Sequence, residues 1–337
     1  MNMHWLWPAA AVLSFALTWM TIRFAEKRRL LDFPNERSSH DRPVPRGGGI
    51  AIVLTFMAGM AGAGLPGAAG DRLVAVLGGG GLVALVGLVD DYRDVPATRR
   101  LVLQFLAATW ALYWLGGVDE EILPGVPMML VNILGVVCTV WLINLYNFMD
   151  GIDGIACIET ITVCIGGIVL YAFGGAHDTA WIPPAMLLAS VAGFVFWNFP
   201  PARIFLGDAG SGFLGFMMAV FCLQAARVEP VLFWGWIVLL GVFIVDSGVT
   251  LARRMLRRQR LYEAHRSHAY QFASRKHGRH APVSLAVGVI NLVWLLPVAL
   301  LTATGRVPVL VALLIAYSPL IWLAFHFKAG APELQET

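Results

Sequence analysis

Long apolar stretches alternate with short polar segments along most of the chain. Each stretch has about 17 to 22 residues, which as an α-helix is long enough to cross a hydrocarbon core of about 30 Å. The pattern predicts an all-α, polytopic transmembrane helical bundle of about 11 helices, forming a single domain over residues 1–337. The expected spans are residues 5–24, 47–66, 72–89, 101–117, 128–147, 154–174, 180–198, 209–226, 231–251, 283–303 and 307–327.

Composition supports this prediction and excludes an ordinary soluble domain. The 337 residues are 58% hydrophobic and only 13% charged, whereas soluble chains carry roughly a quarter of charged residues. The four cysteines all fall inside expected spans, which favours packing roles over a disulfide framework or a metal site.

The basic residues predict the orientation of the bundle. With eleven spans, most of the 24 Lys and Arg residues lie in the polar segments on one side, including the long basic loop 252–282. The opposite side holds only Arg72, Arg227 and Arg306. Because short cytoplasmic loops are rich in Lys and Arg, we expect the basic side to be cytoplasmic and the N-terminus to lie outside.

Acidic residues gather on the same side as the basic residues. An Asp at the centre of a membrane helix costs about 2.5–3.5 kcal/mol, and most of this cost disappears at a helix end. A single Asp at a helix end is usually a solvated cap, but several on one face indicate a functional site. Glu159 and Asp246 are exceptions that lie further inside their spans. The acids at expected cytoplasmic helix ends are Asp90, Asp91, Asp150, Asp153 and Asp208.

The first two cytoplasmic segments contain candidate anion-binding groups. Arg37, His40 and Arg46 can donate to an anion, and glycines such as Gly48 allow a ligand to approach the start of the next helix. The alternative is a basic anchor followed by a helix-starting turn. The adjacent carboxylates of Asp90 and Asp91 require a cation, a shared proton or full solvation.

The most specific motif runs from Asn144 to Gly154, where Asn144, Asn147, Asp150 and Asp153 recur every three residues. An unbroken helix would place only neighbouring members together, whereas a break near Gly151 would bring the set together. Such oxygen donors suit Mg²⁺, which keeps several waters and bridges to phosphates.

A fourth motif surrounds Asp208 with small residues at an expected helix start. Asp208 could join Asn147 on a metal, or it could be a helix N-cap. The motif lacks the lysine of a P-loop, which excludes a nucleoside triphosphatase of that type.

The loop 252–282 contains His265 and His268, which are three residues apart and can face the same way on a helix. A zinc site would need further ligands, so phosphate binding by these histidines and Arg266 fits better. Arginines in this loop could also simply anchor it beside the headgroups.

Together these motifs resemble the polyprenyl-phosphate N-acetylhexosamine-1-phosphate transferases, which include O-antigen initiating enzymes and phospho-N-acetylmuramoyl-pentapeptide transferases. The resemblance is most specific at Asn144–Gly154, Phe205–Ser211 and the Asp90–Asp91 pair. It implies that undecaprenyl phosphate attacks the β-phosphorus of a UDP-N-acetylhexosamine at the bacterial inner membrane. UMP would leave, and synthesis of O-antigen or a related envelope polysaccharide would begin. A homodimer is a further expectation, and nucleic acid is not an expected partner.

The resemblance also implies roles for individual residues. Mg²⁺, with Mn²⁺ as an expected substitute, would be bound by Asn147 and Asp208. Catalytic roles are expected for Asp90, Asp91, Asp150, Asp153, His265 and His268. Substrate binding is expected for Arg37, His40, Arg46, Gly48, Arg100, Asn144 and Arg266.

One departure from the family pattern concerns the donor sugar. The muramoyl-pentapeptide transferases carry consecutive histidines in the last long loop, whereas this chain has His265-Arg-Ser-His268. The stretch His265–Gln271 is most similar to enzymes for 6-deoxy donors such as FucNAc or QuiNAc, while GlcNAc remains an alternative.

Two functions from other classes compete with this interpretation. A transporter of a lipid-linked or nucleotide sugar would place ionisable residues near the bilayer midplane on broken helices, and the glycines at 78–81 could hide such a break. A non-catalytic scaffold would not need the repeated Asn and Asp residues.

Overall fold

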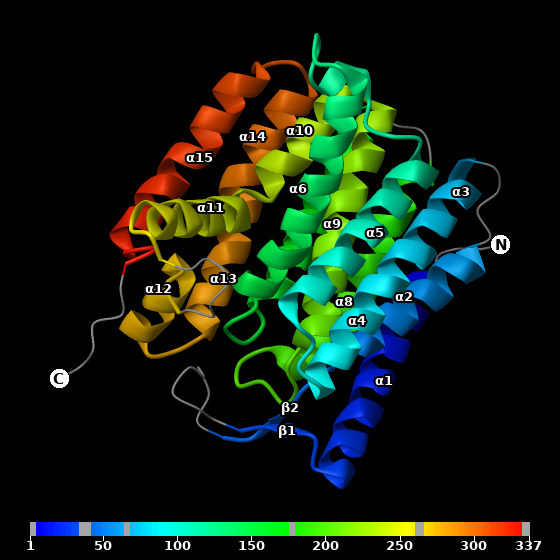
Figure 1. The fold of residues 1–337 in the computed structure, drawn as a ribbon, viewed down its shortest axis with the longest axis vertical. Coiled ribbons are helices and arrows are strands. Elements are labelled where there is room, and N and C mark those ends of the chain that lie inside the picture. Colours follow the sequence, from blue (N-terminus) through cyan, green and yellow to red (C-terminus); the bar gives the residue numbers. More distant parts are fainter. Residues whose placement is uncertain (1–4, 34–41, 64–67, 175–178, 260–265, 332–337) are drawn as a thin grey trace.

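The computed structural model describes residues 5–33, 42–63, 68–174, 179–259 and 266–331. The molecule is a bundle of long helices with one short hairpin at one end, as Figure 1 shows. The all-α, polytopic fold expected from the sequence is confirmed. The α-helices are α1 (Leu6–Arg28), α2 (Gly49–Ala63), α3 (Ala68–Ala75), α4 (Gly81–Tyr92), α5 (Ala97–Leu115), α6 (Met128–Met149), α7 (Ile155–Phe173), α8 (Ile182–Asn198), α9 (Gly207–Val228), α10 (Pro230–Leu239), α11 (Gly241–Leu256), α12 (Ala269–His277), α13 (Ala281–Val289), α14 (Leu296–Ala303) and α15 (Val309–His326).

Short elements complete the chain. Within the described ranges, two π-helical turns join helices without breaking their course, whereas two 3₁₀ turns lie in connections between helices. The strands β1 and β2 pair antiparallel, with Leu31 opposite Pro45. These elements are β1 (Leu31–Asp32), β2 (Val44–Pro45), η2 (Val76–Gly80), η3 (Glu120–Ile122), η4 (Thr179–Trp181) and η5 (Ile290–Leu295).

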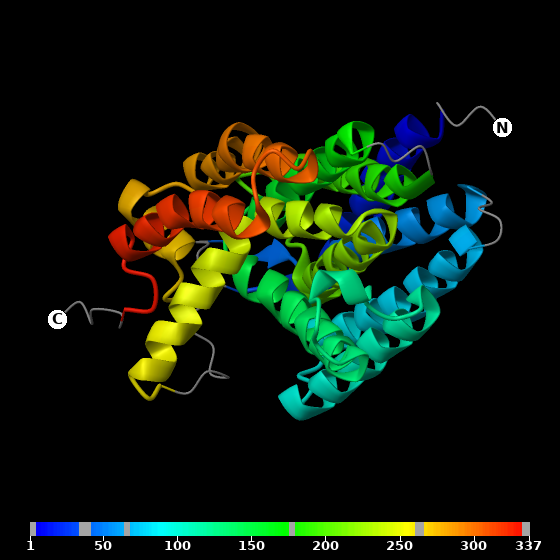
Figure 2. The ribbon, with the colours of Figure 1, turned by 90° about the horizontal axis from the view of Figure 1, so that it is seen from above.

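Helix α9 forms the centre of the bundle and is surrounded by other helices, as the view from above shows (Figure 2). Small residues let its neighbours approach closely. A Cβ atom at Gly215 would lie 2.4 Å from the carbonyl oxygen of Leu142 in α6, and one at Gly87 in α4 would lie 2.4 Å from that of Asp208. This close approach brings the ends of α4 and α6 beside the start of α9.

The number of membrane-spanning helices differs from the expected eleven. In the described residues, eight helices are long and apolar enough to cross a membrane, or nine if a bent pair is counted as one span. Helix α2 has only 15 residues, and α5 begins with a polar turn that includes Arg99 and Arg100. These two helices therefore do not meet the length and composition expected of a full span, although both are apolar over most of their length.

The expected ninth span, residues 231–251, is wrong as a straight helix. Helices α10 and α11 meet at Leu240 with a bend of 68°, and α11 lies across the bundle in Figure 1. Polar residues in α11, including Asp246 and Arg254, explain why it does not continue along the bundle axis. By contrast, the glycines at 78–81 do not break the third span, because η2 connects α3 to α4 as one continuous helix.

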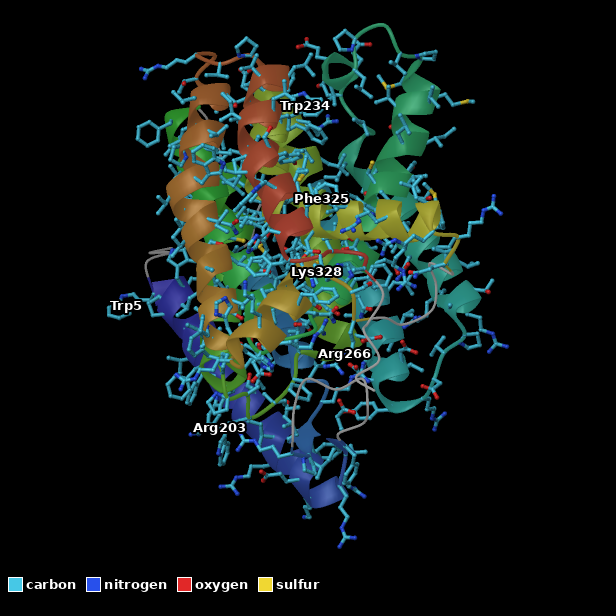
Figure 3. The ribbon with its side chains drawn as sticks, turned by 90° about the vertical axis from the view of Figure 1, so that its left-hand side faces the viewer. Trp5, Arg203, Trp234, Arg266, Phe325 and Lys328 are labelled. Carbon is cyan, nitrogen blue, oxygen red and sulfur yellow. The ribbon has the colours of Figure 1, made fainter. Side chains whose placement is uncertain are left out.

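The polar motifs lie at one end of the bundle. The hairpin β1–β2 and helix α12 lie at the lower end in Figure 1. The side-chain view shows Arg203 at this end and Trp234 at the opposite end (Figure 3). The structure therefore gathers the described polar segments at one end of the bundle, which we call the polar face.

Candidate active site

The first part of the site is the start of α9, which is capped by a carboxylate from another helix. Asp91, in the last turn of α4, accepts hydrogen bonds from the backbone N–H of Asp208 at 2.8 Å and of Ala209 at 3.2 Å. Gly207 has φ +75°, and a Cβ there would lie 2.6 Å from Asp91 Oδ2. Glycine is thus required for this approach. The capping role considered for Asp208 belongs to Asp91.

Asp208 itself bridges two arginines that come from different segments. Its Oδ1 lies 2.8 Å from Arg46 Nη2, and its Oδ2 lies 3.1 Å from Arg100 Nη1. Arg46 Nε is also 3.0 Å from Asp91 Oδ1, and Arg100 pairs with Asp90. We call these five residues the Asp–Arg cluster. Three of them come from helices α4 and α9, and they form one connected network.

Arg46 reaches the cluster because its loop is bound to the segment before α9. Phe205 N–H donates to the Pro45 carbonyl at 2.8 Å, and Gly48 N–H donates to the Phe205 carbonyl at 2.9 Å. Gly48 is packed tightly, since a Cβ there would lie 2.7 Å from the ring of Phe194. Gly48 is therefore a packing position in this structure. Arg37 and His40, expected to bind substrate, lie outside the described residues.

Negative charge exceeds positive charge in this region. Burial opposes the charged form of Arg46, but the carboxylates of Asp208 and Asp91 outweigh it and raise the pKa of this guanidinium above its ordinary value. Burial also raises the pKa of Asp150 well above its ordinary value, and the charge of Asp208 adds to the effect. The three carboxylates of the cluster (Asp90, Asp91 and Asp208) face only two guanidinium groups, so a cation would complete the charge balance.

Asn147 lies beside Asp208, as the sequence analysis expected. Its Nδ2 donates to Ser211 Oγ at 3.2 Å, and its side chain interacts with the carboxylate of Asp208. Asn147 is in the last turn of α6, while Asp208 and Ser211 are in the first turn of α9. The close packing of α6 on α9 thus brings together two residues that are about 60 positions apart.

The other two members of the Asn144–Gly154 motif point elsewhere. Asn144 Nδ2 donates to Gln104 Oε1 at 2.7 Å. Asp153 Oδ2 accepts from Ala202 N–H at 3.0 Å and lies 3.3 Å from His280 Nδ1. Helix α6 remains regular until Met149, so the break comes too late to turn Asn144 toward Asp150. The break near Gly151 does not bring all four side chains together.

The break after α6 is held by α12. Tyr270 Oη donates to the Phe148 carbonyl at 2.9 Å. A Cβ at Gly151 would lie 2.2 Å from this Tyr270 hydroxyl oxygen. Asn198 also contributes, because its Oδ1 accepts from Gly154 N–H at 3.1 Å. The sequence pattern alone predicts no role for Tyr270. Its only signal is that it follows the histidine motif.

His268 is the N-cap residue that precedes α12. Its side chain is 1% exposed, and its Nδ1 lies 3.3 Å from Asp246 Oδ1. Asp246 also accepts from the backbone N–H groups of Ala269 and Tyr270, at 2.9 and 3.0 Å. The carboxylate that sequence analysis found inside a span therefore caps α12. These contacts favour a capping role for His268 over phosphate binding.

The remaining loop residues are only partly described. His265 lies outside the described residues. The Arg266 carbonyl accepts from Arg275 Nη2 at 3.1 Å, and Figure 3 places Arg266 in the lower half of the molecule, toward the polar face.

The oxygen atoms of Asp208 and of the neighbouring Asn147 are of the kind that bind Mg²⁺. No group of three His, Cys, Asp or Glu side chains with metal-binding geometry occurs in the part of the chain that the structure describes. Mg²⁺ commonly needs only one or two carboxylates together with waters and substrate phosphates. Asp208 and the amide of Asn147 meet this requirement.

Comparisons with known proteins point to one family. The profile of glycosyl transferase family 4 matches residues 73–226. The chain is 28% identical over 270 residues to the probable undecaprenyl-phosphate N-acetylglucosaminyl 1-phosphate transferase of Bacillus subtilis, covering 74% of this chain and 70% of that protein. It is 31% identical over 242 residues to the decaprenyl-phosphate N-acetylglucosaminephosphotransferase of Mycolicibacterium smegmatis, covering 65% of this chain and 58% of that protein.

A third relative is covered over most of its length. It is the undecaprenyl-phosphate alpha-N-acetylglucosaminyl 1-phosphate transferase of Thermotoga maritima, 27% identical over 276 residues, with coverage of 80% of this chain and 81% of that protein. The matched profile includes Asp90, Asp91, Asn147 and Asp208, whereas Arg46 and His268 lie outside it.

Proposed function

Because the chain belongs to glycosyl transferase family 4, we propose that it transfers an N-acetylhexosamine 1-phosphate from a UDP-sugar to a polyprenyl phosphate. The observation that carries the proposal is the position of Asp208, which joins Arg46 and Arg100 at the polar face. Polyprenyl phosphate is the acceptor named for the relatives, and its phosphate would enter this face from the membrane.

The proposed reaction forms one bond and breaks one. An oxygen of the lipid phosphate attacks the β-phosphorus of the UDP-sugar, the bond from this phosphorus to the bridging oxygen breaks, and UMP leaves with that oxygen. A phosphate monoester has a second pKa near 6, so the acceptor is mostly ionised at neutral pH. Asp90 and Asp91 are therefore not required as strong bases. Asp91 holds the start of α9, and Asp90 holds Arg100.

The arginines supply charge for this reaction. Phosphoryl transfer depends mainly on positioning and on neutralising the phosphate oxygens. Arg46 and Arg100 are bound to carboxylates in this structure. They would exchange these partners for the diphosphate of the donor, since planar guanidinium groups bind both anions in the same bidentate way.

Mg²⁺ is the proposed cofactor, and Asn147 and Asp208 would hold it. When bound, it would neutralise phosphate charge in the way that is general for phosphoryl transfer. Release of the two arginines from Asp208 would leave this carboxylate available to the cation. The excess of three cluster carboxylates over two guanidiniums supports a cation at this site.

The proposed location is the bacterial inner membrane with the polar face in the cytoplasm, because most Lys and Arg residues lie in the loops of this face. The relatives' names favour GlcNAc as the donor sugar. FucNAc or QuiNAc are the further candidates from the loop motif, and O-antigen initiation is the proposed pathway role.

The experiment uses purified full chain, Mg²⁺, undecaprenyl phosphate and separate UDP-GlcNAc, UDP-FucNAc and UDP-QuiNAc. We expect UMP release with one of these donors and none without the acceptor lipid. An Asp208→Asn variant should lose activity, while the matched variant Asp119→Asn, in the loop at the opposite end, should retain it. Absence of UMP with every donor from folded protein would reject the transferase and favour the transporter.

A further inference from the structure

A cavity lies beside the hairpin at the polar face. It has a volume of about 450 Å³ and is bounded by the end of α1, by β2 and by the end of α8. Its size is within the range of about 300–1,000 Å³ that is typical for small-molecule sites. No member of the Asp–Arg cluster lines it. The side chains that give it its chemistry are Arg23, Arg42, Arg203, Glu26, Trp19 and Trp197.

The lining carries an excess of positive charge. Three guanidinium groups face one carboxylate, and the pair Arg23–Glu26 is long at 4.0 Å. Arg42 Nη2 contacts the Ala202 carbonyl at 3.4 Å, which does not neutralise its charge. Arginine binds phosphate through two parallel N–H groups. The cavity is therefore suited to an anion of the phosphate type.

Two of the arginines are held by tryptophan rings. Arg23 Cζ lies 5.6 Å from the ring centroid of Trp19, and Arg203 Cζ lies 5.5 Å from that of Trp197. Trp197 is itself fixed, because its Nε1 donates to the Phe15 carbonyl at 3.2 Å. Stacking on a ring face orders a guanidinium group and leaves its N–H edge directed toward a ligand.

The cavity lies at the level expected for lipid headgroups. Trp19 and Trp197 occupy the last part of the apolar helices α1 and α8, and such aromatic residues mark the interface between membrane and water. Next to Trp19, the exposed Met20 and Val12 give α1 an apolar surface. A ligand with a phosphate and an apolar tail would fill both regions. Figure 3 shows Arg203 at the polar end of the molecule.

We propose that this cavity binds the headgroup phosphate of an anionic phospholipid such as phosphatidylglycerol. Polyprenyl phosphate and inorganic phosphate present the same chemical group. The phospholipid is favoured for two reasons. None of the three Asp side chains of the Asp–Arg cluster lines this cavity. Its stacked arginines also lie beside an apolar face of helix α1.

The test is native mass spectrometry of the full chain in detergent, titrated with phosphatidylglycerol or with phosphatidylcholine. We expect one phosphatidylglycerol to bind more tightly than phosphatidylcholine. The variant R23Q/R42Q/R203Q should weaken this binding by about tenfold or more, since each basic residue contributes about 1 kcal/mol to binding of anionic lipid. The matched variant K27Q/R28Q/R29Q removes three charges from the same end of α1 outside the cavity and should leave binding nearly unchanged.

A further variant is expected to strengthen binding, which misfolding of the protein would not produce. Glu26→Gln removes the lining carboxylate and should tighten phosphatidylglycerol binding by about two- to threefold. Equal losses in both triple variants would overturn the proposal, because they would show a general charge effect. Displacement of the phospholipid by equimolar polyprenyl phosphate, or by millimolar inorganic phosphate, would likewise overturn it in favour of that ligand.

Discussion

Replacement of Asp91 by Asn separates the structural role of this residue from that of its neighbour Asp90. In the native structure the Asp91 side chain is fully buried and both of its oxygens accept backbone N–H groups from α9. The amide of an Asn provides only one acceptor, and its NH₂ group would face the other N–H. The variant Asp91→Asn should therefore destabilise the start of α9.

The magnitude follows from the lost contacts. A buried donor left without an acceptor costs about 1–3 kcal/mol, and loss of negative charge at a helix N-terminus costs about 0.3–1 kcal/mol. The ion pair with Arg46 adds little, because the Arg46 side chain is 39% exposed. We expect a total of about 2 kcal/mol. This corresponds to a fall in Tm of about 3 °C at this chain length.

The assay is thermal unfolding of purified protein in one detergent, followed by size-exclusion chromatography of the heated samples. Asp90→Asn is the matched control, because Asp90 lies in the same turn and contacts Val95 N–H, Arg100 and the side chain of Asp208, but accepts no backbone N–H from α9 within the described residues. We expect this control to change Tm by less than about 2 °C. An Asp90→Asn variant that is as unstable as Asp91→Asn would refute the capping role of Asp91.

Three further predictions concern the site. Arg46→Lys keeps the positive charge but loses the contact that two guanidinium nitrogens make with Asp91 and Asp208. We therefore expect kcat/KM for UMP release to fall about 100-fold. The control variant Arg99→Lys on α5 should have little effect on kcat/KM. Gly151→Ala should lower Tm by several degrees, because the new Cβ would lie 2.2 Å from the Tyr270 hydroxyl. Gly248→Ala should leave Tm unchanged, because no atom lies within 4 Å of the new Cβ. Equal Tm values for the two variants would contradict this packing. His268→Asn keeps a side chain that can cap α12, so UMP release should stay within about tenfold of wild type. Complete loss of turnover in a folded variant would instead support a catalytic role for His268.

The parts of the fold that the sequence predicts well are those with a local signal. Helices such as α6 and α7 were predicted because their apolar stretches match the thickness of a bilayer. The bend between α10 and α11 was missed because the apolar stretch 231–251 continues through it. Residue patterns show how apolar a segment is, but the direction of a helix depends on the partners that receive its polar side chains.

The candidate site shows the same limit. Asn147 and Asp208 were expected together, and the structure places them together, since each is a polar residue at the end of an apolar helix. Asn144 was assigned to substrate, but it pairs with Gln104, which is 40 positions away and carries no local signal. Asp246 was noticed only as an acid within a span, because its partners at Ala269 and Tyr270 come from a separate helix.

The most direct test of the central claim follows the fate of the β-phosphorus. Purified protein with Mg²⁺ and undecaprenyl phosphate is given UDP-GlcNAc labelled with ³²P in the β-phosphate, or whichever donor releases UMP, and the lipid and aqueous phases are separated. The proposed reaction predicts that the label moves into the lipid phase with the sugar while unlabelled UMP appears in water, and that Asp208→Asn prevents both. Label that remains in the aqueous phase while UMP is released would contradict transfer to the lipid.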